Sequence, residues 1–117
     1  MKSVQPASCP MEALLRVITG PWTIYILWVL SEQCPQRFGA TKRLVPGIST
    51  RVLTERLRML EHAGVVWREQ AMTIPPAVTY GLTERGAELR GVLDTLGSIA
   101  RRWEAEGAFD GTARSAE

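Results

Sequence analysis

Histidine and cysteine are scarce in this sequence, which argues against most metal sites and thiol-based structural sites. The 117 residues include one histidine, His62, and two cysteines, Cys9 and Cys34, which do not form a CxxC pair. A structural zinc site needs four ligands, mostly cysteine and histidine, so we expect no metal and no cofactor. Two isolated thiols also give no reason to expect a structural disulfide.

Long apolar runs are missing as well. The longest covers residues 24–30, seven residues, whereas a membrane-spanning helix needs about 20. The N-terminal sequence MKSVQPASCP lacks the apolar stretch of a secretory signal. We therefore expect a cytoplasmic protein with no membrane partner.

The sequence offers no catalytic motif. No serine or cysteine has a base at motif spacing, and neither a glycine-rich phosphate loop nor an HExxH pair is present. His62 stands near an expected helix end, where a solvated role is ordinary. We do not expect an enzyme.

Charge is what the sequence does have, and its distribution is uneven. Residues 36–68 hold seven basic side chains against two acidic ones, whereas residues 83–117 hold five basic against seven acidic. A basic middle third is what a surface that binds a polyanion requires. Charge alone leaves a merely solvated basic helix face equally open.

The length fits one domain, which we place at residues 9–106, between a flexible N-terminus (1–8) and a flexible tail (107–117). Pro10 suits the first turn of a first helix. A second helix, at about residues 22–31, is apolar nearly all round and should be the buried central helix. A link follows, with a strand-like bend at Arg37 and Phe38.

The middle of the chain reads as a helix-turn-helix. A short helix over residues 39–44 must stop before Pro46, because proline disfavours the helical conformation for the residue that precedes it. Ser49 is a good N-cap for a helix from Thr50 to His62, and Gly64 ends that helix. Two helices joined by a tight turn in this way are typical of DNA-binding domains.

The pattern changes from helical to alternating after Gly64. Residues 65–70 and 78–82 read as two strands of a hairpin, and the segment between them, with Pro75 and Pro76, cannot form a regular ladder. Thr83 then caps a long last helix, expected over residues 83–105. The predicted fold is mainly α with a small β-hairpin (α+β): a winged helix-turn-helix with a recognition helix at 49–63, a wing at 65–82 and a long C-terminal dimerisation helix.

Three segments together carry a family resemblance: CPMEALLRVITGPWTIYIL, RFGATKRLVPGISTRVLTERLRMLEHAGVV and IPPAVTYGLTERG. In this order they resemble the HxlR family of bacterial winged-helix regulators. The resemblance implies homodimers built through the terminal helices and control of nearby promoters. It departs from the family at Pro21, where lysine is common, at Ala77, where arginine is common, and at Cys34, where a small or polar turn residue is usual.

The recognition helix should read bases in the DNA major groove with its polar face. Arg51 is the first candidate for a guanine contact, followed by Arg58 and Thr54, although Arg58 could instead contact phosphate or pair with Glu55. Backbone contacts are expected from the helix N-terminus and from basic residues before it. The predicted DNA-binding residues are Ser49, Thr50, Arg51, Thr54, Arg58, Lys42, Arg43 and Arg37, with Thr73, Pro75 and Pro76 in the wing.

The last helix has a wide apolar stripe that a monomer of this size cannot hide alone. Burial against a second copy, together with the first helix, gives a symmetric dimer. Packing of the stripe on its own domain is the alternative. The predicted interface residues are Leu14, Leu15, Ile18, Leu89, Val92, Leu93, Leu96, Ile99 and Trp103.

The sequence leaves two mechanisms open by which a signal could control DNA binding. Cys9 lies at an expected helix start, which favours a reactive thiol, and the resemblance implies regulation by oxidants or electrophiles through a cysteine at this place. Cys34 is a weaker candidate, as the thiol that would pair with Cys9. Alternatively, a small apolar effector binds between the second and the terminal helices, near Trp22, Tyr25, Trp28, Trp67 and Trp103. A winged helix used only for contacts with protein is the remaining rival to DNA binding.

Overall fold

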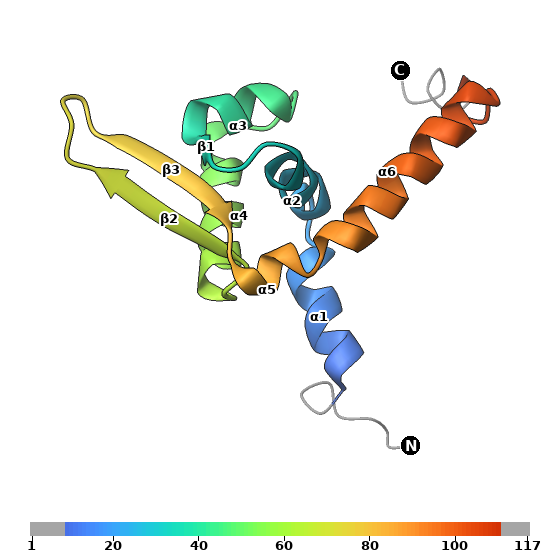
Figure 1. Cartoon of the computed structure of the whole chain (residues 1–117), viewed down its shortest axis with the longest axis horizontal. Helices are drawn as coiled ribbons and strands as arrows, with labels where there is room; N and C mark the ends of the chain where they lie inside the picture. The colour runs from blue at the N-terminus through green and yellow to red at the C-terminus, as the bar shows by residue number, and fades with distance from the viewer. Residues whose placement is uncertain (1–8, 111–117) are drawn as a thin grey trace.

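The computed structural model describes residues 9–110, so the predictions of flexible ends at residues 1–8 and 111–117 lie outside the described residues. Helices dominate, with one small sheet, and the predicted winged helix-turn-helix fold is confirmed (Figure 1). The elements in chain order are α1 (Pro10–Ile18), α2 (Thr23–Glu32), β1 (Gln36–Arg37), α3 (Phe38–Leu44), α4 (Thr50–His62), β2 (Val66–Ala71), β3 (Ala77–Leu82), α5 (Glu84–Ala87) and α6 (Arg90–Ala105).

The central helix α2 forms the middle of the core, as its apolar sequence predicts. Its Ile26, Leu27 and Leu30 are completely buried, and the helix packs against α3, β3 and α6. Trp22, which precedes it, has a φ of 71° in the left-handed region. Among the described residues no single helix has the length and apolar character of a membrane span; α1 and α2 together meet that test, but the pair is bent by 82°.

The sheet has three antiparallel strands in the order β1-β3-β2. The hairpin predicted from the alternating pattern pairs Val66 with Leu82 at its base and Ala71 with Ala77 near its tip. The strand-like bend expected at Arg37 and Phe38 is a short third strand that lies one residue earlier, and the sequence did not predict its pairing: Gln36 pairs with Tyr80 and Arg37 with Thr79. A strand of two residues has no measurable alternation, so only the long-range pairing reveals it.

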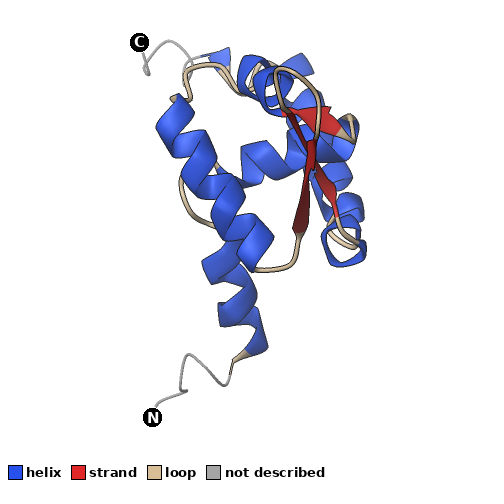
Figure 2. Cartoon of the chain, turned by 90° about the vertical axis from the view of Figure 1, so that its left-hand side faces the viewer, coloured by secondary structure: helices blue, strands red, loops and turns tan. Residues whose placement is uncertain are grey.

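The predicted single helix over residues 83–105 is wrong in one respect, because it is broken into α5 and α6 at Glu88 and Leu89. Two contacts hold α5 against the base of the hairpin. Thr83 donates its hydroxyl to the Gly64 carbonyl, and Gly86 packs so tightly that an added Cβ would overlap the Val65 carbonyl oxygen. The chain changes direction after these contacts, and α6 then crosses α2 and packs against it (Figure 2).

The prediction of a flexible tail from residue 107 is also wrong for residues 107–110. Gly107 adopts a φ of 79°, and the amide of Ala108 donates to the Trp103 carbonyl at 2.9 Å. Phe109 then packs its ring 6.2 Å from the ring of Trp103. A left-handed glycine followed by an apolar contact is a common way to end a helix, so α6 has an ordered C-terminal turn.

Candidate nucleic-acid interface

The tight turn between α3 and α4 is fixed by burial at both of its ends. Val45 is completely buried, and Ile48 is 4% exposed. Gly47 between them has a φ of 91°, a conformation that other residues rarely adopt. The Ser49 hydroxyl accepts a hydrogen bond from the amide of Val52 at 3.1 Å, so the predicted N-cap is confirmed. The PGIS segment therefore holds α4 at a defined angle to α3.

The recognition helix α4 has the bounds predicted from the sequence, and its two faces differ sharply. Leu53, Leu57 and Leu60 are buried against the core, with at most 1% exposed. The opposite face is exposed and carries Thr50, Arg51, Glu55 and Arg58. The apolar side thus fixes the helix to the domain and leaves the polar side to solvent.

Arg51, the first candidate for base contact, is highly accessible. Its side chain is 87% exposed, and its Nε atom lies 3.3 Å from a carboxylate oxygen of Glu55. The alternative pairing of Arg58 with Glu55 does not occur. Thr54 is half-buried and donates its hydroxyl to the Thr50 carbonyl at 2.8 Å. An exposed ion pair contributes about 0–1 kcal/mol, so Arg51 can leave Glu55 for a ligand at small cost.

Arg56 has a structural role that the sequence did not indicate. Its Nε atom donates to the Pro21 carbonyl at 3.0 Å, a contact across 35 residues of sequence. It therefore ties α4 to the turn that precedes α2. No local pattern could reveal this bond, because it depends on the packing of two helices that are distant in the chain.

The predicted wing residues and part of the basic set meet in one groove. Its walls include Arg37 at the end of β1, Thr54 on α4, and Thr73, Pro75 and Pro76 between the hairpin strands, and its volume is about 670 Å³. Arg43 is exposed and Lys42 half-buried in the last turn of α3, and neither lines the groove.

The tip of the wing is uncharged and strongly exposed. Thr73 donates its hydroxyl to the Pro75 carbonyl at 2.8 Å, which closes the turn on itself. Met72 is 96% exposed and Ile74 100% exposed. The sequence placed both in the loop but did not single them out. The tip of the wing can therefore contribute apolar contact and shape but no charge.

The predicted dimer residues differ in how far they are exposed in the single chain. Leu14 and Leu15 on α1, and Val92, Leu96 and Trp103 on α6, are all more than a third exposed, and α1 has no buried residue. Ile99 is half-buried. Ile18 and Leu89 pack partly against the core of their own chain. Leu93 is buried there with 2% exposed, so its assignment to the dimer surface is wrong.

Both cysteines are free thiols among the described residues. Cys9 is the half-buried N-cap residue of α1, and its carbonyl accepts from the amide of Ala13 at 3.0 Å. Cys34 is exposed, yet its sulfur accepts a hydrogen bond from the amide of Leu82 at 3.4 Å. The predicted helix-start position of Cys9 is confirmed, whereas its reactivity stays a prediction.

The predicted aromatic pocket is partly right. Tyr25 and Trp28 line a cavity between α2 and α6. The other three predicted aromatics do not line it, and the ring of Trp67 lies instead over Gly81 on the neighbouring strand. Phe109 lines the cavity instead, from the C-terminal turn that the sequence did not predict.

A capped helix with a polar outer face, a tight turn fixed by burial, and a hairpin beside them define a winged helix-turn-helix transcriptional regulator. The sequence model of the HxlR-like helix-turn-helix family matches residues 17–108. The chain belongs to this family. Among curated sequences it is similar to the uncharacterized HTH-type transcriptional regulator YkvN of Bacillus subtilis, with 36% identity over 107 residues, which are 88% of this chain and 90% of that protein.

A second relative, the HTH-type transcriptional regulator YtcD of Bacillus subtilis, is 43% identical over 86 residues, covering 74% of this chain and 68% of its own length. Among solved structures, the redox regulator HypR in its oxidised form has a TM-score of 0.74 at 35% identity, over 80% of this chain and 96% of that one. Diamide-treated YodB from Bacillus subtilis has a TM-score of 0.64 at 30% identity, over 81% of this chain and 94% of that one.

Proposed function

We propose that this regulator binds an operator of specific sequence by placing α4 in the DNA major groove. The observation that carries the proposal is the outer face of α4, where Arg51 and Arg58 are exposed and make no hydrogen bond beyond their own helix within the described residues. An arginine can contact guanine O6 and N7 together. The rigid inner face and the capped start of α4 hold these side chains ready for such contacts.

The DNA backbone is proposed to contact the surfaces around this helix. Ser49 and Thr50 lie at the N-terminus of α4, whose free amides favour a phosphate. Arg37, Lys42 and Arg43 supply positive charge on the side of α3. Because the wing tip is uncharged, these helices must supply most of the ionic contacts, each of which adds roughly −0.9 to the slope of log affinity against log salt concentration.

The direct test is a fluorescence anisotropy titration with the DNA upstream of the protein's own gene. A duplex of the same length and shuffled sequence is the comparison. Specific binding should exceed binding to the shuffled duplex by at least about a thousandfold. Equal affinity for both duplexes would contradict sequence-specific recognition, and no binding to either would favour a winged helix used for protein contacts.

The regulator is further proposed to act as a homodimer through α1 and α6. One recognition helix reads only a few base pairs, and a twofold dimer places two of them about 34–36 Å apart on successive major grooves. The exposed apolar residues of α1 and α6 support this arrangement, because large exposed apolar patches are typical of interaction surfaces.

Replacing Val92 by aspartate should weaken dimer association by roughly a hundredfold, because it would bury a charge without a partner in each half of the interface. Val92 is 59% exposed in the single chain, so the fold should tolerate the change. Sedimentation velocity over a range of concentrations measures the effect. Ser98→Asp adds the same charge to another flank of α6 and should leave the dimer intact. If V92D forms the dimer as strongly as the wild type does, this face of α6 is not the dimer interface.

Oxidation of Cys9 is the proposed switch, supported by its place at the start of α1 and by the similarity to HypR and YodB. Diamide takes two electrons and two protons from two thiols as one S–S bond forms, so Cys9 needs a second thiol, from Cys34 or from a second copy. Diamide should alter the operator affinity of the wild type but not that of Cys9→Ser. Cys34→Ser and a non-reducing gel identify the second thiol. An unchanged affinity of the oxidised wild type would disprove the switch.

A further inference from the structure

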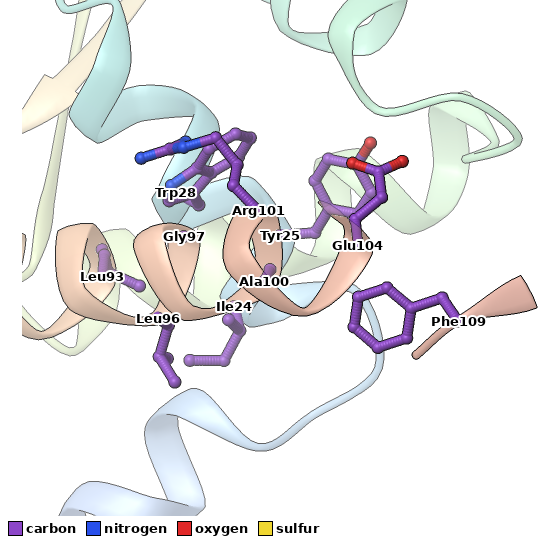
Figure 3. Close-up of a pocket in the computed structure, with 10 residues that line it drawn as sticks. All are labelled: Ile24, Tyr25, Trp28, Leu93, Leu96, Gly97, Ala100, Arg101, Glu104 and Phe109. Atoms are coloured by element: carbon purple, nitrogen blue, oxygen red, sulfur yellow. The ribbon is translucent and has the colours of Figure 1, made fainter. Parts of the chain in front are cut away.

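The cavity between α2 and α6 is a second candidate site, remote from the proposed DNA surface. Its volume is about 530 Å³, within the range of roughly 300–1,000 Å³ of small-molecule sites. Apolar side chains such as Ile24, Leu93 and Leu96 form most of its wall, and the rings of Tyr25, Trp28 and Phe109 complete it (Figure 3). A flat apolar molecule would find both contact area and aromatic faces there.

Two hydrogen-bond donors converge at one side of this cavity, above Gly97. A Cβ added at Gly97 would lie 3.1 Å from the indole nitrogen of Trp28 and 3.6 Å from a guanidinium nitrogen of Arg101. Figure 3 shows both nitrogen groups projecting to the same side. Within residues 9–110 neither group has a hydrogen-bond acceptor or an ion-pair partner. The absent side chain at position 97 leaves these donors open to a ligand oxygen.

The geometry of α6 separates this cavity from the surface assigned to the dimer. At 3.6 residues per turn, Leu93, Gly97 and Ala100 lie within about 60° of one another around the helix, whereas Val92, Ile99 and Trp103 are centred about 100° away. Arg101 lies on the far flank from Val92. A second copy packed on Val92 and Trp103 would therefore border the cavity near Leu96 and leave its donor side open.

We propose that this cavity binds a small aromatic anion, such as an aromatic carboxylate, as an effector. The ring would lie among Tyr25, Trp28 and Phe109, and the carboxylate would accept from the Trp28 indole and the Arg101 guanidinium, a charge-assisted contact. Glu104, also in the wall, lies on the other side of the cavity from the nitrogens of Trp28 and Arg101, so its charge favours placement of the ligand carboxylate on their side (Figure 3). Because α2 packs on both α6 and α3, a molecule wedged between α2 and α6 can change how the two recognition helices are spaced. This last step rests on the proposed function.

The test uses 2-naphthoate and the full chain, followed by NMR of the tryptophan indole N–H signals, with the Trp28 signal identified from Trp28→Phe. Naphthoate should shift the Trp28 signal in a saturable way and leave that of Trp67 in place. Arg101→Gln should weaken naphthoate binding by at least about fivefold. Arg102→Gln, its neighbour on the outer side of α6, should not. The uncharged 2-naphthylmethanol should bind more weakly than naphthoate.

Three outcomes would overturn the proposal. Naphthoate could leave the Trp28 signal unmoved. The alcohol or a naphthyl ammonium could bind as tightly as the carboxylate. Dilution of the dimer alone could shift the Trp28 signal, which would mean that a second copy fills the cavity. Because naphthoate binding is measured without DNA, a failure to bind naphthoate is distinct from a failure of DNA recognition. Addition of naphthoate to the operator titration then tests the effector role. An unchanged operator affinity would refute that role.

Discussion

Replacing Arg51 by alanine is expected to reduce operator affinity by about 1–3 kcal/mol, which is roughly fivefold to more than a hundredfold. The substitution removes a bidentate contact to guanine, while its effect on the fold should be small. The Arg51 side chain is 87% exposed, and its one ion pair, with Glu55, is on the surface. The loss should be largest for the wild-type operator and small for shuffled DNA. Anisotropy titrations at one fixed salt concentration measure both.

The control for Arg51→Ala is Arg90→Ala, which removes the same charge from the exposed first residue of α6. This variant should lose little affinity, and equally little for operator and shuffled DNA. Thermal unfolding of both variants checks that neither has lost structure. If R51A binds the operator as tightly as the wild type does, Arg51 has no part in base recognition.

Replacing Gly86 by alanine should destabilise the protein by about 3 kcal/mol or more, a larger cost than most single substitutions. The new Cβ would overlap the backbone carbonyl oxygen of Val65, and backbone cannot move aside as a flexible side chain can. The same displacement would strain the bond from the Gly86 amide to the Thr83 hydroxyl, which caps α5 at 3.1 Å. Urea unfolding followed by circular dichroism gives the free energy of unfolding.

Gly91→Ala is the matched comparison, because it adds the same methyl group in the first turn of α6 where nothing lies within 4 Å of the new atom. Alanine is favoured over glycine within a helix by about 1 kcal/mol. G91A should therefore be as stable as the wild type or slightly more stable. Equal stability of G86A and G91A would show that the contact between α5 and Val65, just before β2, can relax.

The parts of the fold that local chemistry decides were predictable from the sequence. The bounds of α4 follow from a serine that caps its start and a glycine that takes the left-handed conformation, with φ of 82°, after its end. The hairpin follows from alternation and the two prolines at its tip. The exposed side of α4 follows from the spacing of Leu53, Leu57 and Leu60, so the sequence alone indicates the main candidate residues.

The parts that depend on distant contacts were not predictable. Helical spacing continues through residues 84–105, and only the packing of Gly86 on Val65 reveals why α5 and α6 are separate. Leu93 has the same spacing as the interface residues but points into its own core. Arg56 resembles Arg51 and Arg58 in sequence, yet it binds the Pro21 carbonyl. In each case a partner far along the chain decides the outcome.

The bond from Arg56 to Pro21 has a consequence for how this regulator could acquire new targets. It divides the arginines of α4 into one that bonds to a distant part of the scaffold and two that do not. Substitutions at positions 51 and 58 touch no distant part of the molecule, so they can alter the preferred promoter without a penalty in folding. The fold can therefore be conserved while the target genes of the regulator change, although both depend on residues of the same helix.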